Sequence, residues 1–216
     1  MRTTHPHAPG REYTPPIQNP IPLIRPIRVI RVPVVPYQTT SMTIAHSLDE
    51  LLPRVADWRS EGKTIVLTNG VFDLVHYGHV QYLAAARALG DVLIVALNSD
   101  DSTRRIKGPL RPLVPEAARA AVIAGLRAVD AVVLFDATTA EQVVAAVQPN
   151  VYVKGGDYRL ADGPPVPGLK PLPEAEIVRA YGGKVELISY LPGYSTTELI
   201  NLIRERYAPP GSLGTS

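Results

Sequence analysis

From residue 46 onward the chain alternates between short apolar runs and longer stretches whose apolar residues recur at helical spacing. Runs of this length, rich in Val, Ile and Leu and bounded by polar residues, are typical of buried strands. The expected strands cover 64–68, 91–97, 131–135, 151–153 and 185–190, and the expected helices cover 79–89, 115–127, 139–147, 173–181 and 196–206. Because helices separate the strands, the strands should run parallel with helices on both faces. The chain is therefore predicted to form an α/β fold around a doubly wound parallel sheet of about five strands.

The amino-terminal region differs in character from this alternating part. Its first forty or so residues hold nine of the chain's 22 prolines, which interrupt both helices and internal strands. We expect residues 1–45 to form a disordered Pro-rich tail, residues 46–207 to form one folded domain, and residues 208–216 to form a short disordered end. A membrane-surface or binding arm, and translation that starts at Met42, are the alternatives for the tail.

Charge and composition limit the kinds of partner that this protein is expected to bind. Residues 1–45 carry five arginines and one acidic residue, a balance of +4, whereas the whole chain has a formal net charge of +2 and the remainder therefore −2. A basic pI is typical of nucleic-acid binding, but here the positive excess lies in the tail, so no nucleic-acid partner is predicted. No apolar run approaches the roughly 20 residues that cross a bilayer, and the absence of cysteine fits a reducing compartment. We expect a cytoplasmic protein with no membrane partner.

Two common phosphate-binding motifs do not fit this sequence. Gly62-Lys63-Thr64 resembles the end of a Walker A motif, but the first glycine of that motif would fall at residue 57, which is Asp. The segment also precedes a strand, whereas a true phosphate loop follows one. No Gly-x-Gly-x-x-Gly follows the first expected strand, so an ordinary NAD enzyme is not favoured either.

The segment after the first expected strand carries the most specific chemistry. Residues 68–79 read Thr-Asn-Gly-Val-Phe-Asp-Leu-Val-His-Tyr-Gly-His. Gly70 permits a ligand to approach the backbone closely, and the helix that begins near His79 directs free N–H groups at the same space. His76 can face a bound anion there together with His79. A metal pair is the alternative, but the expected domain offers only His46 besides and no cysteine, so no metal site is predicted.

This string resembles the His-x-Gly-His signature of the cytidylyltransferase-like nucleotidyltransferases, whose fold is Rossmann-like. The resemblance covers about residues 46–207 and continues, in order, through Asn98-Ser99-Asp100, Lys107-Gly108 with Arg111-Pro112, Arg119, Val129-Asp130, 153–158 and Ser195-Thr196-Thr197. The Lys-Gly-Gly-Asp-Tyr string at 154–158 and the Gly-Gly before the last strand are most similar to the adenylyltransferase domain of ADP-heptose synthases. The glycerol-3-phosphate cytidylyltransferases are similar in the first half and less so at 154–158.

The resemblance implies roles for residues that follow the strands. It assigns contact with the triphosphate and stabilisation of the transition state to His76 and His79, and neutralisation of phosphate oxygens to Lys107 and Lys154. These four are the expected catalytic residues. It assigns nucleotide binding to Thr68, Asn69, Gly70, Phe72, His76, His79, Arg119, Lys154, Gly155, Ser195, Thr196 and Thr197. Acceptor binding falls to Asp73, Lys107, Arg111 and Asp157, with a structural role as the alternative for both aspartates. Mg²⁺ is expected to arrive with the nucleoside triphosphate, held mainly by phosphate oxygens and water.

The expected reaction is transfer of AMP from ATP to a sugar 1-phosphate, heptose 1-phosphate by the resemblance, with release of pyrophosphate. The same chemistry with CTP and glycerol 3-phosphate or a related polyol phosphate is the alternative, and a non-catalytic nucleotide-binding protein is a third reading. The segment 159–173 is longer and richer in proline than expected for the heptose enzymes, and it adjoins the expected acceptor side. A homodimer is usual among proteins that this chain resembles, and we expect one here.

Overall fold

A computed structural model describes residues 43–155, 158–159, 168, 170–189, 191 and 193–207. The chain divides into two units, residues 1–38 and 39–216. All helices and strands described below belong to the second unit. The expected amino-terminal tail lies outside the described residues apart from residues 43–45, and the expected carboxyl-terminal end at 208–216 lies outside them entirely.

The second unit is built on a six-stranded sheet in the order β1-β4-β3-β2-β5-β8, and every pair of neighbouring strands is parallel. Its strands are β1 (Thr43–Ala45), β2 (Ile65–Gly70), β3 (Val92–Asn98), β4 (Ala131–Phe135), β5 (Val151–Gly155) and β8 (Lys184–Ile188). Seven helices accompany them: α1 (Leu48–Ser60), α2 (Tyr77–Arg87), α3 (Asp100–Lys107), α4 (Glu116–Ala124), α5 (Glu141–Val147), α6 (Glu174–Ala180) and α7 (Thr196–Tyr207). The doubly wound α/β fold predicted from the alternating pattern is confirmed.

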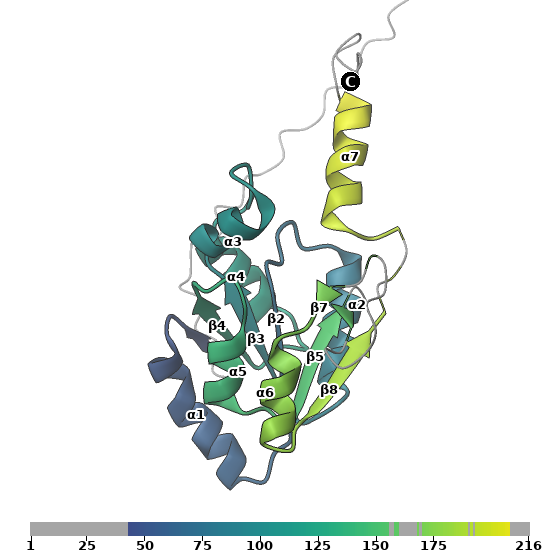
Figure 1. Ribbon diagram of the computed structural model, residues 1–216. Coiled ribbons are helices and arrows are strands. Elements are labelled where there is room, and N and C mark those ends of the chain that lie inside the picture. Colours follow the sequence, from purple (N-terminus) through teal and green to yellow (C-terminus); the bar gives the residue numbers. More distant parts are fainter. Residues whose placement is uncertain are drawn as a thin grey trace, which may run out of the picture. The chain divides into compact units, whose positions relative to one another are not determined.

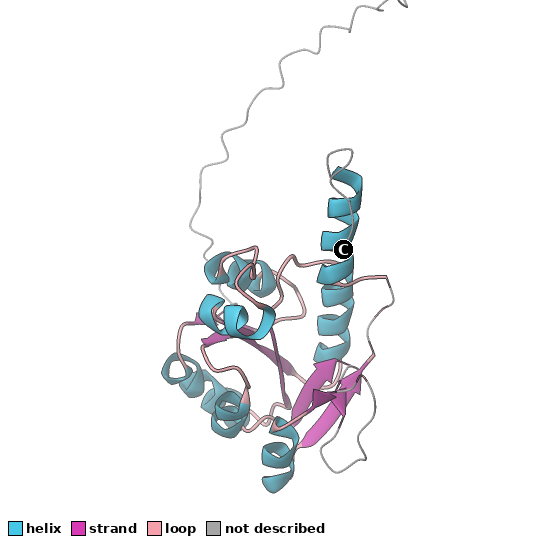
Figure 2. Cartoon of the chain, turned by 45° about the horizontal axis from the view of Figure 1, so that its top comes forward, coloured by secondary structure: helices cyan, strands magenta, loops and turns pink. Residues whose placement is uncertain are grey.

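Helices cover both faces of the sheet, as Figures 1 and 2 show. On one face α1, α5 and α6 contribute side chains such as Trp58, Val144 and Val178 to a buried cluster with alternate strand residues. On the other face α2 and α4 contribute Leu83 and Ile123 to a second cluster. Most residues of β2, β3, β4 and β5 are buried because each face of the sheet has its own helical layer, which explains the nearly continuous apolar runs of these segments. The edge strand β8 has no buried residue.

Five elements were not among those expected, namely α1, β1, β6, β7 and α3. β1 adds a sixth strand next to β4, and it begins before residue 46, where the folded domain was expected to start. A two-stranded sheet pairs β6 (Tyr158–Arg159) with β7 (Lys170–Pro171). The helix α3 has the sequence Asp-Asp-Ser-Thr-Arg-Arg-Ile-Lys, which contains one large apolar residue and so carries no apolar periodicity. Ser99 caps this helix by accepting a hydrogen bond from the Ser102 N–H, and acidic residues at its start and basic residues at its end stabilise it further.

The strand order places the site. β2 pairs with β3 on one side and with β5 on the other, so the chain reverses its direction of winding at β2. Crevices in doubly wound sheets form beyond the carboxyl ends of the strands at such a point.

Among the described residues, no helix combines the length and apolar character needed to cross a membrane.

Candidate active site

A cavity of about 890 Å³ opens beyond the carboxyl ends of β2 and β5. Its wall is assembled from the β2–α2 loop, the end of α3, β5, the start of α6 and the start of α7. Most of the residues predicted to carry function line it: Asn69, Gly70, Phe72, Asp73, His76, His79, Lys107, Arg111, Lys154, Gly155, Ser195, Thr196 and Thr197. Segments up to 128 residues apart in the sequence, from Asn69 to Thr197, thus meet at one place.

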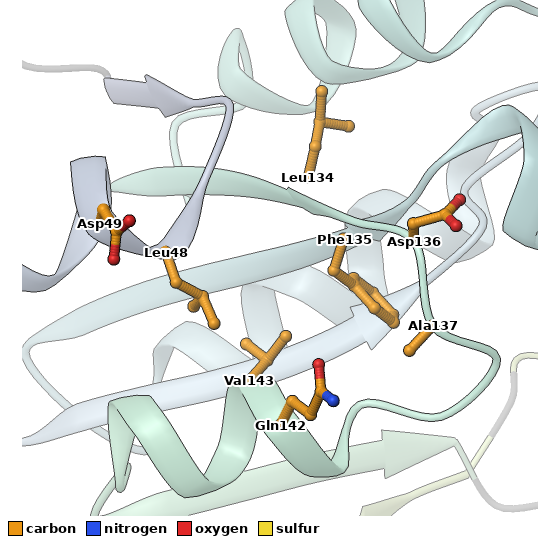
Figure 3. A pocket seen from close by; sticks show the side chains of 8 residues that line it. All are labelled: Leu48, Asp49, Leu134, Phe135, Asp136, Ala137, Gln142 and Val143. Carbon is orange, nitrogen blue, oxygen red and sulfur yellow. The ribbon is translucent and has the colours of Figure 1, made fainter.

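A second hollow, of about 230 Å³, lies at the carboxyl end of β4 between the starts of α1 and α5 (Figure 3). It holds none of the residues predicted to carry function. Its two carboxylates belong to Asp49 and Asp136, and the Asp136 side chain is held by the Ser99 hydroxyl and the Arg105 guanidinium. The cavity at β2 and β5 is therefore the candidate active site.

The two histidines stand at the beginning of α2. His76 is the residue before the first helical turn and has an extended backbone, and His79 lies within that turn. Their rings stack with centroids 3.9 Å apart and an angle of 24° between the planes. The Nδ1 atoms of both rings are buried, and none of the described residues provides either with a hydrogen bond. Each ring therefore keeps a polar nitrogen that can form a further hydrogen bond within the site.

Burial sets the charge of this pair. The pKa of His79 is lowered to about 4, mainly by burial and in part by the neighbouring His76, whereas Asp73 opposes the shift. Burial also lowers the pKa of His76, against the influence of Glu198. Both imidazoles are therefore neutral at neutral pH, and each presents one N–H donor and one acceptor nitrogen.

We expect the free protein to lose stability as the pH falls from about 6.5 to about 4. In this interval unfolded His79 binds a proton and folded His79 does not, so acid favours the unfolded state, by up to about 3 kcal/mol. His79→Asn removes the titrating group, and its unfolding free energy should fall less steeply with acid. Urea unfolding of both proteins at pH 7, 5.5 and 4.5 measures the difference in their pH dependence. His76 titrates in both proteins, so its contribution is common to the two profiles. Parallel pH profiles for the two proteins would show that His79 is not shifted.

A close approach of two chain segments joins α2 to α7. A Cβ atom on Gly78 would lie 2.8 Å from the Tyr194 carbonyl oxygen, so a larger residue would force the segments apart. The Tyr77 and Tyr194 rings meet edge to face at 5.2 Å. The glycine of the His-x-Gly-His string thus permits the start of α7 to lie against the start of α2.

The start of α7 has the cap predicted from the sequence. The Ser195 hydroxyl accepts a hydrogen bond from the Glu198 N–H at 3.1 Å, and the Thr196 hydroxyl donates to the Asp73 carbonyl at 2.8 Å. The starts of α2 and α7 therefore both border the cavity. Helix starts carry unpaired N–H groups and a positive partial charge, which favour a bound anion.

Three cationic residues add positive charge to the same wall. Lys107 ends α3, and Lys154 lies in β5, where its ammonium donates to Asn69 Oδ1 at 2.7 Å and lies 4.6 Å from the centre of the Tyr158 ring. The Arg111 Nε atom donates to Asp73 Oδ2 at 2.7 Å. Neutral imidazoles, helix starts and cations together make the cavity suited to a multiply charged phosphate compound.

The Asp73 carboxylate is hydrogen-bonded to the loop that carries Arg111. Its side chain is fully buried and accepts hydrogen bonds from Arg111 Nε and from the Leu113 and Val114 N–H groups. Burial acts to raise the pKa of this carboxyl, but the hydrogen bonds from Leu113, Arg111 and Val114 outweigh it and hold the pKa below its usual value. This geometry favours the structural alternative over direct binding of the acceptor.

Two predicted residues, Arg119 and Thr68, do not line the cavity. Arg119 is 1% exposed, and its guanidinium donates to the carbonyls of Val71 and Val114 and to the Asp100 carboxylate. It supports the β2–α2 loop from behind, so direct contact with a nucleotide is not favoured by its position. Thr68 is buried and shares a hydrogen bond with the Tyr82 hydroxyl. Asp157 lies outside the described residues.

Several lining residues were assigned no role in binding or catalysis from the sequence, although some of them lie within the motifs. They are Val71, Gly78, Tyr82, Asn98, Ile106, Thr138, Thr139, Tyr158, Lys170, Pro171, Pro173, Glu174, Leu191, Gly193, Tyr194 and Glu198. The two threonines had a usable signal, because they follow β4 at its carboxyl end. Glu174 had no such signal in the sequence, since acidic residues are common in the first turn of a helix. In the folded structure it is buried and accepts a hydrogen bond from the Ala140 N–H.

Comparison with known proteins gives a consistent result. Residues 67–201 match the family model described as Cytidylyltransferase-like. "Bifunctional protein HldE" of Geotalea uraniireducens (strain Rf4) is 47% identical over 162 residues, which is 73% of this chain and 30% of that protein. The protein of the same name from Ectopseudomonas mendocina (strain ymp) is 48% identical over 160 residues, 74% of this chain and 32% of that protein. The crystal structure of the lipopolysaccharide core biosynthesis protein from Thermoplasma volcanium GSS1 is 30% identical, with a TM-score of 0.45, and the match covers 60% of this chain and 98% of that one.

The chain thus spans about a third of the length of the curated relatives that it matches. The family model covers more than half of this chain and includes the paired histidines, Lys107, Lys154 and the start of α7. The resemblance inferred from the His-x-Gly-His string is therefore confirmed. The chain belongs to the cytidylyltransferase-like family.

Proposed function

We propose that the protein transfers AMP from ATP to a sugar 1-phosphate, with heptose 1-phosphate as the first candidate, and releases pyrophosphate. The observation that carries the proposal is the convergence of the paired histidines, two helix starts, Lys107 and Lys154 on one cavity. Such a set of donors suits a triphosphate that lies beside a second phosphate. The choice of ATP and a heptose acceptor rests on the similarity of residues 154–158 to the ADP-heptose synthases.

The reaction needs no protein nucleophile. An oxygen of the acceptor phosphate, already an anion at neutral pH, attacks the α-phosphorus of ATP. The bond from that phosphorus to the bridging oxygen breaks, and pyrophosphate leaves with the electron pair. Because two anions must meet in line while charge builds on the leaving group, positioning and charge stabilisation supply most of the rate.

The lining residues provide these two contributions. Neutral His76 and His79 donate hydrogen bonds to phosphate oxygens, and Lys107 and Lys154 offset the charge of the two substrates. The Ser195 and Thr196 segment presents helix-start N–H groups to the terminal phosphates. Arg111, which keeps two Nη groups beyond its Nε bond to Asp73, is placed to hold the acceptor phosphate.

MgATP is the expected form of the nucleotide substrate. Within the part of the chain that the structure describes, no group of three or more His, Cys, Asp or Glu side chains is arranged to hold a metal ion. Phosphate oxygens and water would then supply most of the ligands of Mg²⁺, as is usual for this ion with nucleotides. The protein's own side chains act on the phosphates.

The rival within the family is a CTP-dependent reaction with glycerol 3-phosphate or a related polyol phosphate. The His-x-Gly-His geometry serves both reactions equally, because it contacts phosphates and not the base. The two proposals differ in the nucleobase and in the acceptor. A pyrophosphate-release assay that crosses ATP, CTP, GTP and UTP with sugar 1-phosphates and glycerol 3-phosphate separates them.

We expect release with ATP and a sugar 1-phosphate, and a rate near background when either is omitted. Release with CTP but not with ATP would overturn the nucleotide assignment, and release only with glycerol 3-phosphate would overturn the acceptor. His79→Ala protein, prepared in the same way, controls for contaminating enzymes.

A further inference from the structure

A buried hydrogen-bond network lies beneath Lys154. Tyr152 and Lys154 are two residues apart in β5, so their side chains project from the same face of the sheet. Tyr152 is fully buried among the core residues of that face, whereas Lys154 lines the cavity. The Tyr152 hydroxyl donates to Asn69 Oδ1 at 2.7 Å, and the Lys154 ammonium donates to the same oxygen at 2.7 Å. One amide oxygen thus links a core phenol to a cation of the site.

The chemistry of the donors fixes the orientation of the Asn69 amide. Burial raises the pKa of Tyr152 well above its usual value, and the charge of the Glu174 carboxylate and its hydrogen bond with the phenol raise it further, so the phenol remains protonated. A lysine ammonium carries only donors, so the Asn69 atom that faces it must be the oxygen. The Asn69 Nδ2 group is therefore on the opposite side of the amide from both bonds, and no acceptor for it is present among the described residues.

We infer that Tyr152 is a positioning residue for nucleotidyl transfer that acts on Lys154 through Asn69. This inference rests on the proposed role of Lys154 in offsetting phosphate charge. A lysine side chain has large rotational freedom, and its restriction before substrate binds removes an entropic cost from the reaction. Two donors on one oxygen hold the amide plane more firmly than one. Tyr152 itself touches no substrate, because it does not line the cavity.

A double-mutant cycle between Tyr152→Phe and Lys154→Met tests the coupling. Tyr152→Phe removes only the hydroxyl. We expect kcat to fall about tenfold and the dissociation constant of ATP to rise about threefold, the effect of losing one hydrogen bond that supports a charged group. In the Lys154→Met background the same change should lower kcat less than twofold, because the group that Tyr152 positions is gone. Equal losses in the two backgrounds, or no loss in the first, would overturn the inference.

Tyr181→Phe is the matched control. Tyr181 packs against the same core cluster, and its buried hydroxyl has no hydrogen-bond partner among the described residues. It does not line the cavity, so the loss of its hydroxyl should leave kcat unchanged. Calorimetric titration of ATP into the four proteins of the cycle answers the same question without turnover. Non-additive dissociation constants support the inference even if no acceptor reacts, and additive dissociation constants overturn it. If the wild-type protein reacts with no pair of nucleotide and acceptor, that result contradicts the proposed function alone.

Discussion

Replacement of His79 by alanine is expected to lower kcat at least about a hundredfold, as the loss of one donor to a developing charge commonly does. The imidazole stacks on His76 and borders the cavity, and its pKa of about 4 keeps it a neutral donor at the pH of the assay. The melting temperature should change little, because the mutation also removes a buried Nδ1 atom that has no hydrogen bond from the described residues. Steady-state kinetics and thermal unfolding on the same preparation measure both effects.

His46→Ala is the matched control for this change. His46 is exposed, lies between β1 and α1 and does not line the cavity, so its replacement should leave kcat unchanged. A His79→Ala protein with wild-type kcat would remove His79 from the mechanism. A large fall in melting temperature together with lost activity would instead indicate a structural role.

Asp73→Asn is expected to destabilise the protein by about 3 kcal/mol, because it removes one charge of a buried ion pair and leaves Arg111 unbalanced. The amide also offers one acceptor oxygen where the carboxylate accepts from Leu113, Val114 and Arg111. Since this loop carries Arg111 to the cavity, KM for the acceptor phosphate should rise while KM for the nucleotide changes less. The urea midpoint and the two KM values report these effects.

Asp101→Asn is the control for loss of an ion pair. Asp101 pairs with Arg104 on the exposed surface of α3, where such pairs contribute little. We expect no measurable change in urea midpoint or kinetics. If Asp73→Asn raised KM for the acceptor without any loss of stability, Asp73 would be a direct acceptor ligand and its structural assignment would be wrong.

The sequence alone predicted the position of residues that directly follow a strand or begin a helix. The alternation of apolar runs with helices predicts a parallel sheet, and a parallel sheet gathers everything that follows its strands at one edge. Gly70, His76, Lys154 and Ser195 therefore converge for topological reasons, although 125 residues separate the first from the last. The cap of α7 also follows from four consecutive residues.

Residues whose surroundings come from distant segments could not be placed in this way. Arg119 has the charge expected of a phosphate ligand, but Asp100 and the carbonyls of Val71 and Val114 enclose it. The role of Tyr152 depends on the register that sets β5 beside β2 and so brings Asn69 within reach. Neither pairing has a signature in the order of residues.

The measurement that tests nucleotidyl transfer most directly is the fate of labelled phosphorus from ATP. The wild-type protein is incubated with a sugar 1-phosphate and ATP labelled at either the α or the γ position, and the products are separated. We predict that the α-label appears in a sugar nucleotide and the γ-label in pyrophosphate. Transfer of the γ-label to the acceptor, or its release as orthophosphate, would contradict the account.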